Sequence, residues 1–135
     1  MPITLRELIA EPELKLRLVA GTEADSLDRE LTWVHSSDLI DPTPWLEPGQ
    51  LLLTDGSQFG GDASVTDYVR RLRDAEIVGL GYAVGVITPE LPQALVDACR
   101  DQQLPLVVVA NRLPFIRIIR HVADAIAADR SARVT

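Results

Sequence analysis

The stretch Pro105-Leu106-Val107-Val108-Val109 is a continuous apolar run, followed closely by the polar pair Asn111-Arg112. A strand that is apolar at every position is typical of a sheet with both faces covered. Earlier in the chain, Ile77-Val78-Gly79-Leu80-Gly81-Tyr82 predicts a second strand of the same kind. Strands of this type are usual in parallel sheets, so an α/β fold is the expected class.

Amphipathic helices are expected around these strands. Three segments place apolar residues at helical spacing: Val65, Tyr68, Val69 and Leu72 behind a Ser64 cap; Leu91, Leu95, Ala98 and Cys99 after Thr88-Pro89; and Phe115, Ile119, Val122 and Ile126 after Pro114. Alternation of strands and helices predicts a parallel sheet with right-handed crossovers.

The N-terminal third is expected to be richer in strands. Strands are predicted at 14–19, by alternating leucines, at 30–35, with Leu31 and Trp33 on one face, and at 50–54. Thr4-Leu5-Arg6-Glu7 has the spacing of a capping box and predicts a short helix that ends before Pro12. The segment Asp41-Pro42-Thr43-Pro44 predicts an ordered loop that buries Trp45 and Leu46.

The chain of 135 residues fits one domain with an adequate core. We expect a single α/β domain over residues 1–128, with a mostly parallel sheet and flanking helices. The polar residues 129–135 are expected to be a frayed tail or the start of a linker.

Composition limits the classes of function. Cys99 is the single cysteine, and neither a signal peptide nor a bilayer-spanning run is apparent, so a cytoplasmic location away from membranes is expected. The net charge of −7 argues against direct DNA binding, which depends on Lys and Arg to neutralise phosphates.

Two motifs suggest chemistry but have simpler interpretations. His35-Ser36-Ser37-Asp38 follows a predicted strand, yet a nucleophilic triad must converge in space, and no G-x-S-x-G elbow is present. Gly79, Gly81 and Gly85 lack the spacing of a dinucleotide fingerprint. We therefore expect loop ordering in the first case and close packing in the second, and no cofactor.

A metal site is a further alternative. His35 with Asp38, Asp41 and Asp55 could supply imidazole and carboxylate ligands. Loop aspartates more often form turns and caps, so we expect no metal.

The carboxyl ends of the predicted strands offer a candidate ligand pocket, because parallel sheets bind ligands at that edge. The candidate residues there are His35, Ser36, Asp38, Thr54, Asp55, Gly56, Asn111 and Arg112. They could contact a small polar ligand or cap their loops without one, and both interpretations stay open.

Several segments together resemble the N-terminal domain of the PucR family of bacterial transcriptional regulators. They are 33–39 (WVHSSDL), 41–46 (DPTPWL) and 49–54 (GQLLLT), supported by 4–8, 80–81, 105–106 and 114–116. The resemblance extends over residues 3–126, with departures at Asp55 and at Asn111-Arg112-Leu113. It implies a regulatory module, often in catabolic pathways including purine catabolism, with DNA bound by a separate helix-turn-helix domain.

Three hypotheses of function follow. The first is a non-enzymatic sensor of a small catabolic metabolite, with the last helix transmitting the signal. The second is a ligand-free oligomerisation module, in which a homodimer forms through Phe115, Ile119, Val122 and Ile126 or through a sheet edge. The third is a small hydrolase or isomerase, which requires His35 and a carboxylate to converge on a substrate pocket.

Overall fold

The sheet contains five strands in the order β1-β5-β4-β3-β2. The structure is a computed structural model that describes residues 2–59, 64–110 and 112–134. The strands are β1 (Arg17–Ala20), β2 (Trp33–Ser36), β3 (Gln50–Thr54), β4 (Gly79–Ala83) and β5 (Leu106–Val109). Neighbours from β2 to β5 pair in parallel, whereas β1 pairs antiparallel with β5. The expected α/β class and mostly parallel sheet are confirmed.

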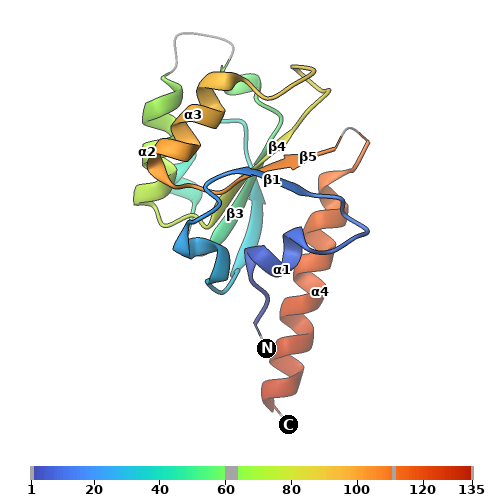
Figure 1. Ribbon diagram of the computed structural model, residues 1–135. Coiled ribbons are helices and arrows are strands. Elements are labelled where there is room, and N and C mark those ends of the chain that lie inside the picture. Colours follow the sequence, from blue (N-terminus) through green and yellow to red (C-terminus); the bar gives the residue numbers. More distant parts are fainter. Residues whose placement is uncertain (1, 60–63, 111, 135) are drawn as a thin grey trace.

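Helices cover both faces of the sheet, as Figure 1 shows. The α-helices are α1 (Leu5–Ile9), α2 (Val65–Asp74), α3 (Gln93–Gln102) and α4 (Phe115–Val134), and short 3-10 turns form η1 (Asp25–Asp28), η2 (Thr43–Trp45) and η3 (Ser57–Phe59). α2 and α3 lie together on one face, and α1 and α4 lie on the other. The last turns of α4 extend beyond the sheet, so the C-terminus lies away from it.

The central strand β3 explains why the core has two halves. All five of its residues are buried, and successive side chains point to opposite faces. Leu51 and Leu53 join the cluster beneath α1 and α4, while Leu52 joins the cluster beneath α2 and α3. The strand is apolar at successive positions because its side chains pack into two separate hydrophobic clusters, one on each face of the sheet.

Two helices begin with the caps that the sequence predicts. The Thr4 hydroxyl accepts a hydrogen bond from the Glu7 amide at 3.2 Å, and the Ser64 hydroxyl accepts one from the Asp67 amide at 3.2 Å. Each bond satisfies one of the backbone donors that a helix leaves free at its first turn. These caps set the first residues of α1 and α2.

Two tryptophans lie on the surface, and one of them, Trp45, was expected to be buried. Trp33 is 42% exposed and Trp45 is 65% exposed. β2 is an edge strand, and its buried residue is Val34, which packs into the α4 side of the core. The predicted burial of Trp45 is therefore wrong.

Three element boundaries also differ from expectation. Thr88-Pro89 does not start α3, because the Thr88 hydroxyl binds the carbonyl of Glu90 and the helix begins at Gln93 behind Pro92. Residues 129–134, expected to be a frayed tail or a linker, continue α4 as helix. β1 starts later than predicted, at Arg17, after Lys15 adopts a left-handed backbone with φ of 51°.

Candidate functional site

The carboxyl ends of β2 and β3 carry a hydrogen-bond network centred on Thr54. Its buried hydroxyl lies 2.8 Å from Asp38 Oδ1 and 2.9 Å from Gln58 Oε1, so its single proton can be donated to either acceptor, and it accepts from the Gly56 amide at 3.1 Å. Gln58 Nε2 in turn donates to the Tyr68 hydroxyl at 3.0 Å. The network, which we call the Thr54 network, thus links the loop after β2 to helix α2.

Asp38, Asp55 and Gly56 complete the Thr54 network. Asp38 Oδ1 also accepts from the Asp55 amide at 3.2 Å, and Asp55 Oδ1 accepts from the Ser57 amide at 2.9 Å. Partial burial pushes the pKa of Asp55 upward, but hydrogen bonds involving Ser57, Asp38 and the Asp55 backbone together outweigh it and hold that pKa below its ordinary value. The polar groups at this edge therefore mainly satisfy one another.

Gly56 is the tightest point of this edge. Its φ is +87°, and an added Cβ would overlap the hydroxyl and ring of Tyr82. The Tyr82 hydroxyl lies 2.9 Å from the Thr88 hydroxyl, and Phe59 stacks on the Tyr82 ring. Only glycine combines this backbone conformation with such a close approach.

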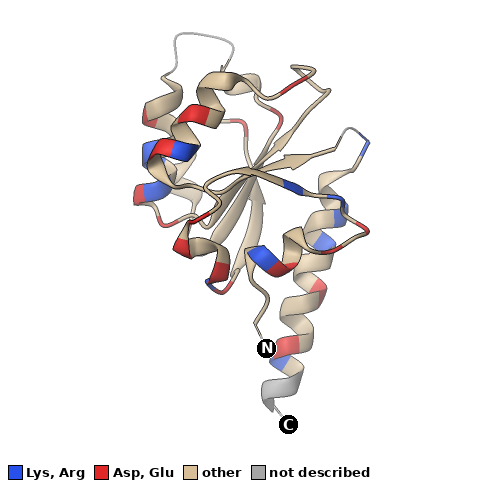
Figure 2. Cartoon of the chain, in the orientation of Figure 1, with Lys and Arg blue, Asp and Glu red and all other residues tan. Residues whose placement is uncertain are grey.

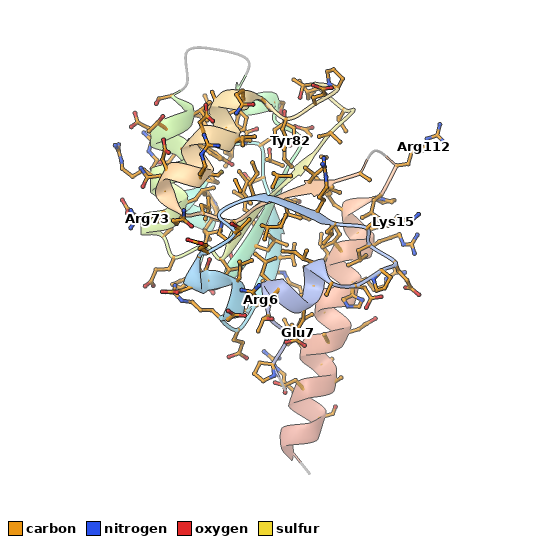
Figure 3. The ribbon with its side chains drawn as sticks, in the orientation of Figure 1. Arg6, Glu7, Lys15, Arg73, Tyr82 and Arg112 are labelled. Atoms are coloured by element: carbon orange, nitrogen blue, oxygen red, sulfur yellow. The ribbon has the colours of Figure 1, made fainter. Side chains whose placement is uncertain are left out.

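The structure joins some of the predicted site residues and separates others. Asp38, Thr54, Asp55 and Gly56 belong to the Thr54 network. His35 is half-buried on the edge strand β2, and Ser36 is exposed. Arg112 is exposed at the loop before α4 and points away from the body of the protein, as Figure 3 shows. Asn111 lies outside the described residues.

The residues predicted for oligomerisation or signal transmission pack inward. Val122 is fully buried, and Phe115, Ile119 and Ile126 pack against the same core cluster as partly buried side chains. The exposed apolar residue at the start of α4 is Ile116, which is 54% exposed. The predicted stripe therefore attaches α4 to the sheet.

The metal site and the pairing of His35 with a carboxylate, weighed from the sequence, can both be compared with the described residues. No group of three or more His, Cys, Asp or Glu side chains there is placed to hold a metal ion. Nor does any hydrogen bond or ion pair join His35 to a carboxylate within residues 2–59, 64–110 and 112–134. Burial raises the pKa of the Cys99 thiol to about 12, so this buried group stays protonated near neutral pH.

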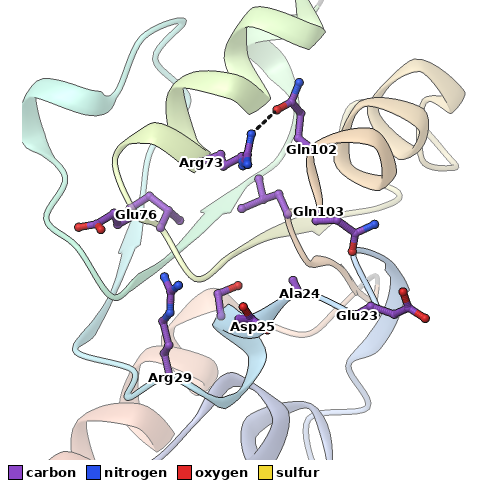
Figure 4. Close-up of a pocket in the computed structure, with 11 residues that line it drawn as sticks. Glu23, Ala24, Asp25, Arg29, Arg73, Glu76, Gln102 and Gln103 are labelled. Carbon is purple, nitrogen blue, oxygen red and sulfur yellow. Dashed lines mark hydrogen bonds between the residues drawn. The ribbon is translucent and has the colours of Figure 1, made fainter.

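A cavity of about 410 Å³ lies at the other ends of the parallel strands from the Thr54 network, next to the C-terminal ends of α2 and α3 (Figure 4). We call it the amino-end cavity, because it lies near the amino ends of β4 and β5. Its lining residues come from three separate parts of the sequence: Glu23, Ala24, Asp25, Ser26 and Arg29; Arg73, Glu76 and Ile77; and Gln102, Gln103 and Leu104. Sequence reasoning did not find this cavity because no local motif marks it.

None of the helices in the described part of the chain combines the length and the apolar character needed to cross a membrane. Residues 7–126 match the profile of the purine catabolism regulatory protein-like family, PucR. The chain belongs to the PucR family. The resemblance stated from the sequence is confirmed over nearly the same residues.

A curated relative of this PucR domain is transcriptional activator PmfR from Paenarthrobacter nicotinovorans. It is 29% identical over 133 residues, which make up 98% of this chain and 28% of the relative. The chain thus spans less than a third of the length of that protein. No solved structure matches the chain.

Proposed function

We propose that this PucR domain is the N-terminal signal-sensing domain of a bacterial transcriptional regulator. It responds to a small catabolic metabolite and passes the signal to a helix-turn-helix domain elsewhere in a longer protein. The observation that carries this proposal is the family match over residues 7–126, together with a relative that is named a transcriptional activator and is much longer than this chain.

The structure supports a division of labour between sensing and DNA binding. Basic residues are interspersed with acidic ones along α2, α3 and α4 in Figure 2, and the net charge of the chain is −7. A surface of this kind is poorly suited to a phosphate backbone. We therefore propose that a separate domain of the regulator contacts DNA. We also propose that the regulator is located in the cytoplasm.

α4 is the element best placed to transmit a signal. Its first half is anchored to the sheet through Ile118 and Val122, and its last turns extend beyond the domain (Figure 1). A change in the packing beneath α4 would therefore move the end of the helix as a rigid lever. Such a signal requires that the metabolite bind one arrangement more tightly than the other.

A metabolite panel tests the proposal. Purine-pathway and other catabolic metabolites are screened for thermal stabilisation of this chain and for induction of a reporter gene by the full-length regulator. A ligand at one hundred times its dissociation constant adds about 2.7 kcal/mol of stability. We expect every inducer to stabilise the chain. An inducer that acts on the regulator without binding this chain contradicts the proposal.

A second candidate function is dimerisation through the sheet edge at β2. Four apolar residues on β2 and in the segment after it are exposed: Trp33, Leu39, Ile40 and Trp45. An unprotected edge strand beside exposed tryptophans is a common site of association. A homodimer at this edge would position paired DNA-binding domains on symmetric half-sites.

Sedimentation velocity tests this alternative with two matched variants. Trp33→Arg introduces a charge at the edge strand, whereas Ile116→Arg introduces one on the exposed face of α4. We expect a dimer that Trp33→Arg dissociates and Ile116→Arg preserves. A monomer at high micromolar concentration contradicts dimerisation, and the reverse response of the two variants would place the interface on α4.

A further inference from the structure

The walls of the amino-end cavity are charged and its floor is apolar. Ala24, Ile77 and Leu104 are buried beneath it, and Ser26 fastens η1 to the sheet through a 2.8 Å hydrogen bond from its hydroxyl to the carbonyl of Val78. A cavity of about 410 Å³ lies within the size range of small-molecule sites. The floor and the fastened turn give the cavity a defined shape.

Two helices end at this cavity in the same way. α2 is followed by Glu76 with φ of 61°, and α3 is followed by Gln103 with φ of 52°. A left-handed residue after a helix turns the chain sharply, here into the segments that lead to β4 and β5. The carbonyl ends of both helices consequently lie near the cavity, where they favour positive charge.

Two arginines place positive charge at the same cavity. Arg29 and Arg73 approach the cavity from opposite sides, whereas the carboxylates of Glu23 and Glu76 point away from it (Figure 4). Arg73 Nη1 donates to Gln102 Oε1 at 3.1 Å and keeps its other donors. No hydrogen bond or ion pair occupies the Arg29 side chain within the described residues. An anionic group in the cavity would therefore find two guanidinium partners.

Asp25 lines the same cavity from η1, and its carboxylate has no side-chain partner within the described ranges. Resting on the sensing function proposed above, we propose that the amino-end cavity binds a small zwitterion, a molecule that carries both a carboxylate and an ammonium group. Its carboxylate pairs with Arg29 and Arg73. Its ammonium group pairs with Asp25 and the carbonyl ends of α2 and α3.

Both charges are needed to match the site. A carboxylate alone would face Asp25 and two helix carbonyl ends, which disfavour anions. An amine alone would face two arginines. Since each ion pair is solvent-exposed, each contributes modestly, and selectivity comes from satisfying both at once. The spacing between the two charged groups of the ligand should therefore affect affinity.

Calorimetric titration of this chain tests the inference with glycine, β-alanine and 5-aminopentanoate at millimolar concentration. Pentanoate and pentylamine are the controls, since each carries one of the two charges. We expect one zwitterion to bind at least about fivefold more tightly than either control. A zwitterion that binds no better than pentanoate, or the absence of binding by all three, overturns the inference.

Variants locate the binding site. Arg29→Gln and Arg73→Gln should each weaken zwitterion binding by about fivefold, and Asp25→Asn should reduce it to the affinity of pentanoate. Arg70→Gln is the matched control, because Arg70 lies on α2 and pairs with Asp67 at 2.7 Å outside the cavity. Equal affinity in the wild type and in all three cavity variants would place binding elsewhere and overturn the inference.

A reporter assay separates this inference from the proposed function. The full-length regulator carrying Arg29→Gln should lose sensitivity to its inducer. If that variant responds normally while the inducer still stabilises this chain, the sensing function stands and the cavity assignment fails. If no inducer binds this chain in any form, the sensing function itself fails.

Discussion

The two ends of the parallel strands, which we call the carboxyl edge and the amino edge of the sheet, differ in how far their polar side chains are hydrogen-bonded. At the carboxyl edge, Asp38, Thr54 and Asp55 bind one another and neighbouring amides, and no buried side-chain polar atom in the described residues lacks a partner. At the amino edge, Arg29 and Asp25 line a cavity without side-chain partners there. Parallel sheets usually bind ligands at the carboxyl edge, and here several polar groups at that edge already hydrogen-bond one another.

This difference indicates that polar side chains at a strand end can stabilise loops as well as bind ligands. A ligand must compete with the hydrogen bonds that already exist, and the Thr54 network offers it few free partners. The amino-end cavity retains a positively charged donor, Arg29, and a negatively charged acceptor, Asp25, that are not paired with other side chains in the described residues. Substitutions in the Thr54 network should therefore reduce stability, whereas substitutions in the amino-end cavity should reduce ligand binding.

The largest effect is expected for Gly56→Val. The new side chain would adopt φ of +87° and overlap the Tyr82 hydroxyl, so it should lower the free energy of unfolding by about 3 kcal/mol or more. Denaturant unfolding measures this change. Gly49→Ala is the control, since Gly49 has φ of +85° but would meet the side chain of Thr32. A loss for Gly49→Ala as large as that for Gly56→Val would show that the overlap with Tyr82 contributes no extra destabilisation.

A smaller loss is expected for Thr54→Val. The variant keeps the shape of the side chain but leaves the Gly56 amide without its partner, which should cost about 1–3 kcal/mol of unfolding free energy. Thr32→Val is the matched control, because its exposed hydroxyl donates only to the carbonyl of Pro48, and we expect a loss of less than about 1 kcal/mol there. Similar losses at both positions would mean that the Thr54 network contributes little.

Acid should reduce the contribution of Asp55. Because its pKa is lower in the folded state, the carboxylate stabilises the fold fully above its unfolded pKa of about 3.9, and this stabilisation is lost as pH falls through the folded pKa. The difference in thermal midpoint between the wild type and Asp55→Asn should therefore shrink below about pH 4. A difference that stays constant from pH 7 to pH 3 would contradict the assigned shift.

The smallest change in stability is expected at the other edge. Arg29→Gln and Arg73→Gln alter exposed side chains and should change the free energy of unfolding by no more than about 0.5 kcal/mol. The same denaturant measurements apply. A loss comparable to that of Thr54→Val would indicate that the cavity residues stabilise the fold, and the contrast between the edges would disappear.

Local sequence patterns predicted the features that depend on local physics. β3 has the predicted bounds Gln50–Thr54, and Ser64 caps α2, since burial on both faces and helix capping are decided by neighbouring residues. The exposure of Trp33 could not be predicted, because it depends on β2 being an edge strand. Strand order is a property of the whole sheet.

The candidate site divides in the same way. The proximity of Asp38 to Thr54 follows from the parallel pairing of β2 with β3, and the sequence placed both residues at one edge. The amino-end cavity instead brings together residues near positions 25, 75 and 103, which only the packing of α2, α3 and η1 makes neighbours. No spacing rule in the sequence relates these segments.

Chemical-shift mapping of backbone amides during a titration with 5-aminopentanoate tests the contrast between the two edges most directly. We predict that the shifts concentrate at residues 23–29, 73–77 and 102–104, with little change around Asp38 and Thr54. Shifts that concentrate at residues 36–38 and 54–58 would contradict the account, because they would place ligand binding at the Thr54 network and not at the amino-end cavity.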